Sequence, residues 1–532
     1  MNVPTNAPRR ALQADLALSI LEFVFALLFC VIFVVFLTSF GGEFLIVVRG
    51  LWILPVFLVL LVGSAVAALV LSVRSLRSGA FQDLPAQGTW SARAKTLWLL
   101  GWSVWNLIAI VPIVLVGKVL ALGALGSVPT VLIALLTLPF IGTAAVFLFG
   151  SLRTLAGLIR RRIDVRLPRG AAGSGFAFLF AFAAFGVLCA LWNPRWTDGV
   201  EHMALFVPGD EPGRGYRIPA MVVLPGDVLL AFAESRVNAM SDLLDIDLVM
   251  RRSLDGGRSW SPLVVLQDDG PHTVHSPCPV FDPSTQTVWL PFCIDYQTLH
   301  ITRSADAGLT WSEPRDLSLE LGLAEGLWCH NGPGNGIVMS TGRLVIPTSL
   351  GEARVIYSDD HGQTWAVGEP IGRGGEPQVF ERTDGALCAN LRNARGADRI
   401  VACSQDGGET WGPWSLDDEL PDAGTQASIL RYTTQASGGH NRLLFSNPGA
   451  PYRGEFTLRM SYDEGASWPV SKLVYEGAAG YSQLAILSDH TILALFETGR
   501  YDLRQSITLV RVTLDWLTDG ADRIAPAQSS QP

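Results

Sequence analysis

Five copies of one octapeptide pattern punctuate the C-terminal part of this 532-residue chain. The pattern is Ser-x-Asp-x-Gly-x-Ser/Thr-Trp, and its copies begin at residues 253, 304, 358, 404 and 461, with spacings of 51, 54, 46 and 57 residues. A repeat of about 50 residues is typical of the blades of a β-propeller. The repeat therefore restricts the fold more than any other feature of the sequence.

The segments between the copies have the pattern of short β-strands. They are apolar or alternating and are bounded by turn residues, as in DVLLAFAES, TVWLPFC, RLVIPTSL, ALCANLR and TILALFE. At roughly 52 residues per blade, the chain from residue 203 to residue 515 holds six blades. The sequence predicts an all-β, six-bladed propeller over residues 199–515, followed by a C-terminal tail, 516–532, that we expect to be disordered.

The aspartates of the repeat have a structural interpretation. Asp and Gly supply the side-chain-to-backbone bonds and the positive φ angles of a tight turn. The closing Trp provides a large apolar side chain that can pack between neighbouring sheets. A propeller normally has one central site rather than five peripheral ones. We therefore interpret Asp463 and its four counterparts as turn scaffold and look for functional residues elsewhere.

The N-terminal part of the chain has a different character. Each of its five long apolar runs approaches or exceeds the roughly 18–20 residues that cross a bilayer as a helix. These runs lie at about 17–39, 51–73, 97–117, 129–150 and 174–192. They are too long and too closely spaced for core helices, and a cleaved signal peptide would explain only the first. The sequence predicts an α-helical membrane domain of about five spans in residues 1–198, which anchors the chain in a lipid bilayer.

The charges of the loops predict the orientation of these spans. Basic residues gather before the first span, between the second and third, and between the fourth and fifth, whereas the alternate loops hold only Arg49 and Lys118. Basic loops stay cytoplasmic. We expect an integral membrane protein with a cytoplasmic N-terminus and an exoplasmic propeller, periplasmic or extracellular, after Trp192.

The two parts also differ in net charge. Residues 1–198 hold 15 basic and 6 acidic residues, a net charge of +9, and residues 199–532 hold 24 basic and 42 acidic residues, a net charge of −18. Binding to phosphate backbones requires a basic surface. The sequence therefore predicts no nucleic-acid partner.

The seven cysteines are too few and too irregularly spaced for a disulfide framework. The five in the C-terminal part are most simply interpreted as buried small apolar residues: Cys278, Cys293, Cys329, Cys388 and Cys403. A bridge between Cys388 and Cys403 stays open as the alternative.

The octapeptide resembles the Asp-box of exo-α-sialidases, also called neuraminidases. Asp-boxes occur in propellers without glycosidase function, so a functional assignment depends on the residues between them. Three arginines stand in contexts that resemble the arginine triad of this family: Arg217 in YRIP, Arg392 in NLRN and Arg453 in SNPGAPYRGEFTLRMS. Sialic acid carries a carboxylate on its anomeric carbon, and a guanidinium binds a carboxylate through two parallel hydrogen bonds.

The resemblance also implies a set of reacting groups. The carboxylate of the substrate would repel an Asp or Glu nucleophile, and sialidases use a tyrosine instead. Tyr481, in GAAGYSQLAIL, matches this position, and Glu376, in GGEPQVFE, resembles the base that a tyrosine with a pKa near 10 requires. Asp242, in ESRVNAMSDLLDIDLVMRRS, takes the acid/base position. Asp245 and Asp247 are rivals on spacing alone. Asp245 lies at the start of an alternating strand and Asp247 lies within it, so Asp242 is preferred.

Two further residues match substrate-binding positions of the family. Arg236 precedes the acid/base loop, and Glu497, in LALFETG, resembles the glutamate that orients the first arginine of the triad. Two positions depart from the family pattern, with Gln483 where many relatives have Asp and Leu244 where the acid loop often has Gly. Neither departure removes a reacting group, but both put loop geometry and the preferred leaving group in doubt.

The resemblance covers about residues 203–515 and implies a retaining exo-α-sialidase that hydrolyses terminal sialic acid from sialylated glycans or glycoconjugates without a cofactor. No metal site is expected, because His272 and His275 lie in a Pro-rich loop without a matching acidic pattern. Two alternatives stay open. A catalytically silent sialoglycan-binding propeller would need the arginines but not the Tyr–Glu pair, and a trans-sialidase would share the glycosyl-enzyme intermediate.

Overall fold

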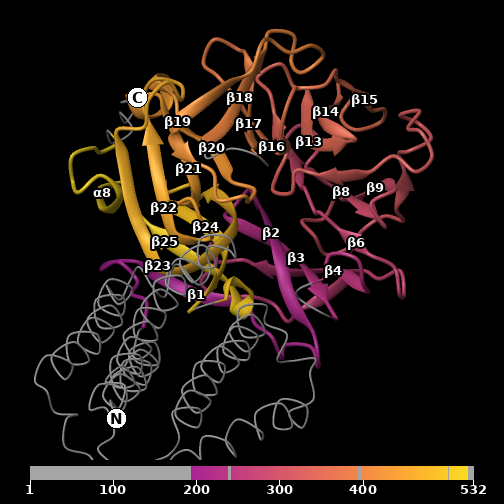
Figure 1. Cartoon of the computed structure of the whole chain (residues 1–532), viewed down its shortest axis with the longest axis horizontal. Helices are drawn as coiled ribbons and strands as arrows, with labels where there is room; N and C mark the ends of the chain where they lie inside the picture. The colour runs from indigo at the N-terminus through magenta and orange to yellow at the C-terminus, as the bar shows by residue number, and fades with distance from the viewer. Residues whose placement is uncertain (1–192, 238–240, 394–397, 501, 525–532) are drawn as a thin grey trace, which may run out of the picture. The chain divides into compact units, whose positions relative to one another are not determined.

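The computed structural model describes residues 193–237, 241–393, 398–500 and 502–524 (Figure 1). These residues belong to one compact unit, Asn193–Pro532. The five predicted spans and their orientation fall on residues 1–192, outside the described residues. Among the residues that are described, no helix is long and apolar enough to cross a membrane.

Four successive sheets follow the first strand of the unit, and their strands pair antiparallel. The first holds β2 (Gly215–Leu224), β3 (Val228–Arg236), β4 (Ile246–Ser253) and β5 (Val264–Gln267). The second holds β6 (Val274–His275), β7 (Val280–Asp282), β8 (Thr287–Ile294), β9 (Thr298–Ser304) and β10 (Arg315–Asp316). The third holds β11 (Cys329–Asn331), β12 (Ile337–Val338), β13 (Leu344–Leu350), β14 (Glu352–Ser358) and β15 (Ala366–Val367). The fourth holds β16 (Gly375–Glu381), β17 (Leu387–Arg392), β18 (Asp398–Ser404) and β19 (Ser415–Pro421).

The last sheet has seven strands in the order β1-β25-β24-β23-β22-β21-β20. Its strands are β20 (Ser428–Thr433), β21 (Arg442–Pro448), β22 (Gly454–Ser461), β23 (Val470–Ile486), β24 (Ile492–Gly499), β25 (Ser506–Val512) and β1 (Glu201–Phe206). The 17-residue strand β23 pairs with β22 through its first half and with β24 through its second half. It therefore belongs to two four-stranded sets, β20–β23 and β23–β25 with β1, and joins them into one sheet. Strand β1, from the start of the unit, completes that sheet beside β25.

Each sheet contacts the next one along the chain, and β2 of the first sheet contacts β23 and β24 of the last. Figure 1 shows the sheets following one another from β2–β4 through β6–β9, β13–β15 and β16–β19 to β20–β25. Apolar clusters fill the spaces between neighbours. One such cluster contains Leu229 of β3 together with Leu493 and Leu495 of β24. The prediction of an all-β fold for this part of the chain is confirmed.

All five octapeptides form turns at equivalent places, after β4, β9, β14, β18 and β22. In the copy at 304–311, Asp306 Oδ1 accepts the N–H of Thr310 at 2.9 Å and Oδ2 accepts its hydroxyl at 2.5 Å. The Ser304 hydroxyl donates to Asp306 Oδ1 at 2.8 Å and accepts the N–H of Gly308 at 2.9 Å. The same bonds recur in the other four copies. The interpretation of these aspartates as turn scaffold is confirmed.

The closing tryptophans pack against neighbouring sheets, also as predicted. The ring of Trp311, after β9, lies edge-on to Phe232 of β3 with centroids 6.0 Å apart. Trp365, after β14, meets Trp289 of β8 with centroids 6.3 Å apart. Each repeat therefore closes its own turn and fills part of the core beside the preceding sheet.

The cysteine interpretation requires one correction. Cys388 of β17 and Cys403 of β18 are direct partners in the strand register and form a disulfide. The preferred interpretation of both as free buried residues was wrong, because sequence spacing does not reveal that two strands bring the thiols opposite each other. Cys278, Cys293 and Cys329 are buried and free, as expected.

Short helices complete the unit: α7 (Gln435–Gly438), the 3₁₀ helix η2 (Leu503–Gln505) and α8 (Leu514–Leu517). Residues 516–524, which the sequence assigned to a disordered tail, are instead held by specific contacts. The Asp522 carboxylate accepts two bonds of 2.6 Å from the Arg442 guanidinium and one of 2.9 Å from the Tyr462 hydroxyl. Residues 525–532 lie outside the described residues.

The octapeptide turns predict a loss of stability in acid. The hydroxyl and backbone N–H of Thr310 lower the pKa of Asp306 to about 2, whereas an unfolded Asp titrates near 4. Because the folded-state pKa is depressed, this contribution to stability is present above pH ~4 and is lost as the pH falls from about 4 to about 2. We expect Asp306→Asn to lower the melting temperature at neutral pH and to reduce its dependence on pH between 4 and 2.

Thermal unfolding scans across this pH range measure both effects. Asp418→Asn, at an exposed position on β19 outside the octapeptides, is the matched control and should follow the parent protein. An identical pH dependence in Asp306→Asn and the parent would contradict the assignment.

Candidate functional site

Strands β2 and β16, each the first strand of its sheet along the chain, are both interrupted by a proline. A site residue lies two positions before the proline in β2 and one position before it in β16. In β2, the register with β3 is lost after Arg217, where Ile218 has a φ of 57° and Pro219 follows. In β16, the register with β17 is lost around Glu376, which has a φ of 44° and precedes Pro377. Proline cannot donate to a β-ladder, and the resulting bulges redirect nearby side chains. Local sequence therefore determines where Arg217 and Glu376 leave the ladder.

Glu497 of β24 is a buried carboxylate that ties β2 to β23. Its Oε1 accepts from Arg217 Nε at 2.9 Å and from the Ile218 N–H at 3.0 Å. Its Oε2 accepts from Arg217 Nη2 and from the Tyr481 N–H, both at 3.2 Å. Burial favours a higher pKa for Glu497, but the charge and hydrogen bonds of Arg217 outweigh it and hold the pKa below the usual value. A Cβ at position 480 would collide with this carboxylate and force it to shift, so glycine there leaves room for Glu497.

The hydroxyl of Tyr481 donates a hydrogen bond to Glu376 Oε1. Arg392, at the end of β17, donates from Nη1 to the same Glu376 oxygen at 2.8 Å and to the Tyr481 hydroxyl oxygen at 3.1 Å. Burial, reinforced by the negative charge of Glu376, raises the pKa of Tyr481 well above its usual value despite the nearby arginines. The hydroxyl is therefore protonated at neutral pH, and its proton is directed at a carboxylate.

Two further guanidiniums flank the ring of Tyr481. The Cζ atom of Arg217 lies 5.4 Å from the ring centroid and that of Arg453 lies 5.9 Å from it. Arg453 precedes β22, and its Nη2 donates to the carbonyl of Gly424 at 2.9 Å. The structure thus brings together the three arginines predicted as a triad around the predicted nucleophile. Three convergent guanidiniums form a site that is suited to a carboxylate ligand.

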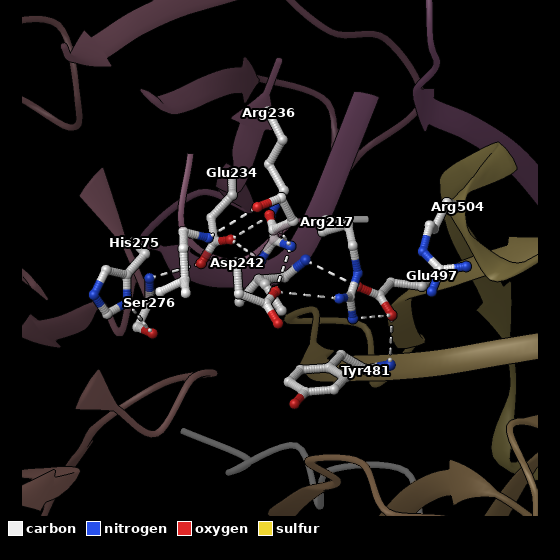
Figure 2. A network of polar contacts seen from close by, with 12 residues as sticks. Arg217, Glu234, Arg236, Asp242, His275, Ser276, Tyr481, Glu497 and Arg504 are labelled. Carbon is white, nitrogen blue, oxygen red and sulfur yellow. Dashed lines mark hydrogen bonds and ion pairs between the residues drawn. The ribbon is translucent and has the colours of Figure 1, made fainter. Parts of the chain in front are cut away.

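Asp242 lies on the loop between β3 and β4, with its side chain 58% exposed. Its Oδ1 accepts from Arg236 Nη1 at 2.6 Å and lies 3.7 Å from Arg217 Nη1. Burial favours a higher pKa for Asp242, but the charges of Arg236 and Arg217 outweigh it and lower the pKa. Arg236 also forms an ion pair with Glu234. Figure 2 shows that the ion pairs link Glu234, Arg236, Asp242 and Arg217 in succession.

The rival aspartates have other partners. Arg214 Nη2 lies 2.9 Å from Asp245 Oδ1 and 2.8 Å from Asp247 Oδ2. Asp247 is buried in β4, where burial, followed by the charges of neighbouring acids, raises its pKa to about 6 in spite of Arg214. Of the three aspartates, Asp242 is the one whose carboxylate contacts Arg236 and Arg217.

Glu234 was not identified from the sequence. It is 1% exposed, accepts from Arg236 Nε at 2.8 Å and accepts the Ser276 N–H at 2.8 Å. A usable signal was present, because Glu234 and Arg236 are two residues apart in β3 and alternate residues of a strand share a face. An acid and a base on one face of a buried strand indicate an internal ion pair.

A stack of rings lies next to Glu234. The rings of His275 and Tyr296 are stacked with centroids 3.7 Å apart, and Trp328 stacks on Tyr296 at 4.2 Å. Burial, followed by the charges of Glu234 and Asp242, raises the pKa of Tyr296 well above its usual value. Tyr296 is therefore an uncharged neighbour of the ion pairs that Glu234 and Asp242 form with Arg236.

The His272 and His275 pair has structural contacts. His272 Nδ1 and Asp295 Oδ2 are 2.6 Å apart, and the buried ring of His275 accepts the Tyr296 N–H at 3.2 Å. In the part of the chain that the structure describes, no group of three His, Cys, Asp or Glu side chains could hold a metal ion.

Comparisons with known proteins identify relatives of this chain. The profile of the BNR repeat-like domain family matches residues 227–494. A sialidase of Micromonospora viridifaciens is 34% identical over 352 residues, which cover 59% of this chain and 54% of that protein. An exo-α-sialidase of Aspergillus fumigatus is 32% identical over 356 residues, which cover 57% of this chain and 85% of that protein.

A solved structure described as the Hadza microbial sialidase Hz136 aligns with a TM-score of 0.56 at 29% identity, covering 59% of this chain and 69% of that one. The chain thus spans about half the length of the Micromonospora protein and most of the length of the Aspergillus protein. The match to the family profile lies within the repeat-bearing part of the sequence.

Proposed function

The chain belongs to the sialidase family of glycoside hydrolases, and from this premise we propose that it is a retaining exo-α-sialidase that releases terminal sialic acid from sialylated glycans or glycoconjugates. The observation that carries the proposal is the Tyr481–Glu376 hydrogen bond within reach of three guanidiniums. A site that only bound a sialoglycan would need the guanidiniums, but it would not need a buried tyrosine that is directed at a carboxylate.

The proposal includes a six-bladed propeller as the scaffold. Strand β23 is shared by two four-stranded sets within the seven-stranded sheet. Counted as two blades, these sets and the other four sheets give six. The contact of β2 with β23 and β24 then closes the propeller.

In the proposed mechanism, Arg217, Arg392 and Arg453 bind the carboxylate of the substrate and Arg236 adds a further contact. Arg217 is held in place by Glu497 before any ligand arrives. Preorganised charge of this kind stabilises an anionic ligand without reorganisation during the reaction. The same clamp places the anomeric carbon next to the Tyr481 hydroxyl.

Tyr481 then attacks the anomeric carbon while its hydroxyl proton passes to Glu376, and the bond from that carbon to the leaving oxygen breaks. Asp242 donates a proton to the leaving oxygen. Water next attacks the tyrosyl intermediate, with Asp242 as the base, the proton on Glu376 returns to the Tyr481 oxygen, and sialic acid leaves with retained configuration. A neutral tyrosine suits a substrate whose own carboxylate repels an anionic nucleophile.

The acid role of Asp242 requires a proton that the ligand-free site disfavours, because Arg236 and Arg217 lower the pKa of this group. A bound substrate carboxylate would neutralise part of the charge of Arg217. The pKa of Asp242 would then rise toward the range in which a carboxyl group can serve as a general acid. We propose that substrate binding itself prepares Asp242 for protonation.

The direct test is release of a fluorogenic phenol from an aryl α-sialoside by the full-length protein in detergent. We expect turnover, a loss of roughly 10²-fold or more in kcat for Tyr481→Phe, and loss of substrate binding for Arg217→Ala. The NMR signal of the first product should be that of the α-anomer. Glycan binding without turnover would instead identify a silent binding protein, and transfer to an added sugar in preference to water would identify a trans-sialidase.

The role of Asp242 predicts a dependence on the leaving group. In Asp242→Asn, kcat should fall by about 10²–10⁴-fold for a sialoside with a sugar leaving group. It should fall much less for the aryl sialoside, because a phenolate departs with little protonation. Asp245→Asn, which alters a carboxylate paired with Arg214, is the matched control and should stay within a few-fold of the parent. Equal losses for both substrates would rule Asp242 out as the acid.

We propose that residues 1–198 anchor the protein in a lipid bilayer with the N-terminus in the cytoplasm and the propeller on the exoplasmic side. The distribution of basic loops supports this orientation. The Cys388–Cys403 disulfide supports it independently, because disulfides persist mainly in oxidising compartments.

Reporter fusions test the orientation. Alkaline phosphatase fused after residue 200 should be active, because it folds only in an oxidising compartment, and a fluorescent protein that matures only in the cytoplasm should stay dark at the same position. The reverse pair of results would exclude an exoplasmic propeller.

A further inference from the structure

The connection between β19 and β20, residues 422–427, contacts one arginine of the candidate site directly and the residues that follow two other site residues. Its first residue, Asp422, is buried and accepts the N–H of Asn393, the residue after Arg392, at 2.6 Å. The same carboxylate accepts from Arg399 Nη1 at 3.2 Å and from the Gly424 N–H at 2.7 Å. Asp422 therefore fixes both the end of β17 and the course of the connection itself.

The middle of the connection reaches the third arginine. The carbonyl of Gly424 accepts from Arg453 Nη2 at 2.9 Å, and the carbonyl of Thr425 accepts from Arg399 Nη1 at 2.8 Å. The backbone of this segment is thus held by a buried arginine on one side, and it holds a site arginine on the other.

Gln426, at the end of the connection, reaches the tyrosine strand. Its side chain is buried, with 1% exposure of the residue, and its Nε2 donates to the carbonyl of Ser482 at 2.9 Å. Its Oε1 accepts the Ser482 N–H at 3.1 Å. Ser482 directly follows Tyr481, at the place where the register between β23 and β24 shifts. The amide of Gln426 therefore acts as a strand partner for the backbone next to Tyr481.

Resting on the function proposed above, we propose that Gln426 is a positioning residue for Tyr481. Glu497 holds the N–H of Tyr481 itself, and Gln426 holds both backbone groups of the next residue. One of these buried side chains comes from β24 and the other from the connection between β19 and β20. Together they define the backbone from which the phenol reaches Glu376.

This arrangement has a specific kinetic consequence. The side chain of Gln426 forms hydrogen bonds with Ser482, whereas Arg453 is held through Gly424 and Arg392 is flanked by Asp422 through Asn393. Loss of the Gln426 amide should therefore displace the phenol more than the carboxylate clamp. Displacement of a reacting group by about 1 Å can cost roughly 10²-fold in rate, while binding through the arginines should be retained.

The first test is Gln426→Ala in the full-length protein with the aryl α-sialoside. We expect kcat to fall by ~10-fold or more with KM within about threefold of the parent value, and the inhibition constant of free sialic acid should be unchanged. Thr302→Val is the matched control, because Thr302 of β9 is equally buried and its hydroxyl donates to the carbonyl of Ser312, between β9 and β10, at 2.6 Å. A kcat equal to that of the control, or a parallel loss of kcat and inhibitor binding, would overturn the proposal.

Gln426→Glu provides a second test that does not depend on how well the alanine variant folds. A protonated carboxyl group has one donor and one acceptor, as the amide edge that meets Ser482 does, whereas a carboxylate has no donor and repels the Ser482 carbonyl. The ratio of kcat in Gln426→Glu to kcat in the parent should therefore rise as the pH falls. A ratio that is constant with pH would contradict a role for this hydrogen-bond pair.

The parent protein separates this proposal from the proposed function. If the parent has no turnover on any α-sialoside, the proposed function fails, and the positioning role fails with it. If the parent turns over and both Gln426 variants match it, only the positioning role fails.

Discussion

One buried carboxylate, that of Glu497, holds together the strands on which the site depends. It binds the guanidinium of Arg217 and the backbone of Ile218 on β2, and it binds the backbone of Tyr481 on β23. These strands belong to the first and the last of the successive sheets. A charge removed from water is costly unless it is paired and hydrogen-bonded, and here both oxygens have partners. The contact between the first and the last sheet is therefore also the place where Arg217 and Tyr481 of the site are held.

The other guanidiniums of the site are fixed by similar means. Arg236 is paired with Glu234 and Asp242, Arg392 with Glu376, and Arg453 with a backbone carbonyl. Four guanidiniums are thus gathered at one place together with four carboxylates, in a part of the chain whose net charge is −18. Because the acids already orient the guanidiniums, an anionic ligand meets a site that needs little rearrangement.

Features that depend on contacts between residues close in the sequence could be predicted, and features that depend on contacts between distant residues could not. The octapeptide turns were predictable, because the Asp306 carboxylate bonds to residues at most four positions away. The prolines in YRIP and GGEPQ are also local features, and each coincides in the structure with an interruption of its strand. The Cys388–Cys403 disulfide was an alternative that was not preferred, and the contacts of Asp522 were not predicted, because they depend on strand register and on pairing between distant segments. Gln426 was missed for the same reason, because its contact with Ser482 spans 56 residues. Glu234 differs, because its partner Arg236 is two residues away in the same strand and the signal was local.

The sequence by itself determined that the C-terminal part would be built of short strands with aspartate-stabilised turns, and it marked the family contexts of eight candidate residues. These features are local, since alternation and turn chemistry act within a few residues of the chain. Only the tertiary structure decided which carboxylate faces which guanidinium. Glu497 and Arg217 are separated by 280 residues and Tyr481 and Glu376 by 105. Such pairs are set by bulges and by the packing of successive sheets, which bring distant strand ends to within hydrogen-bonding distance.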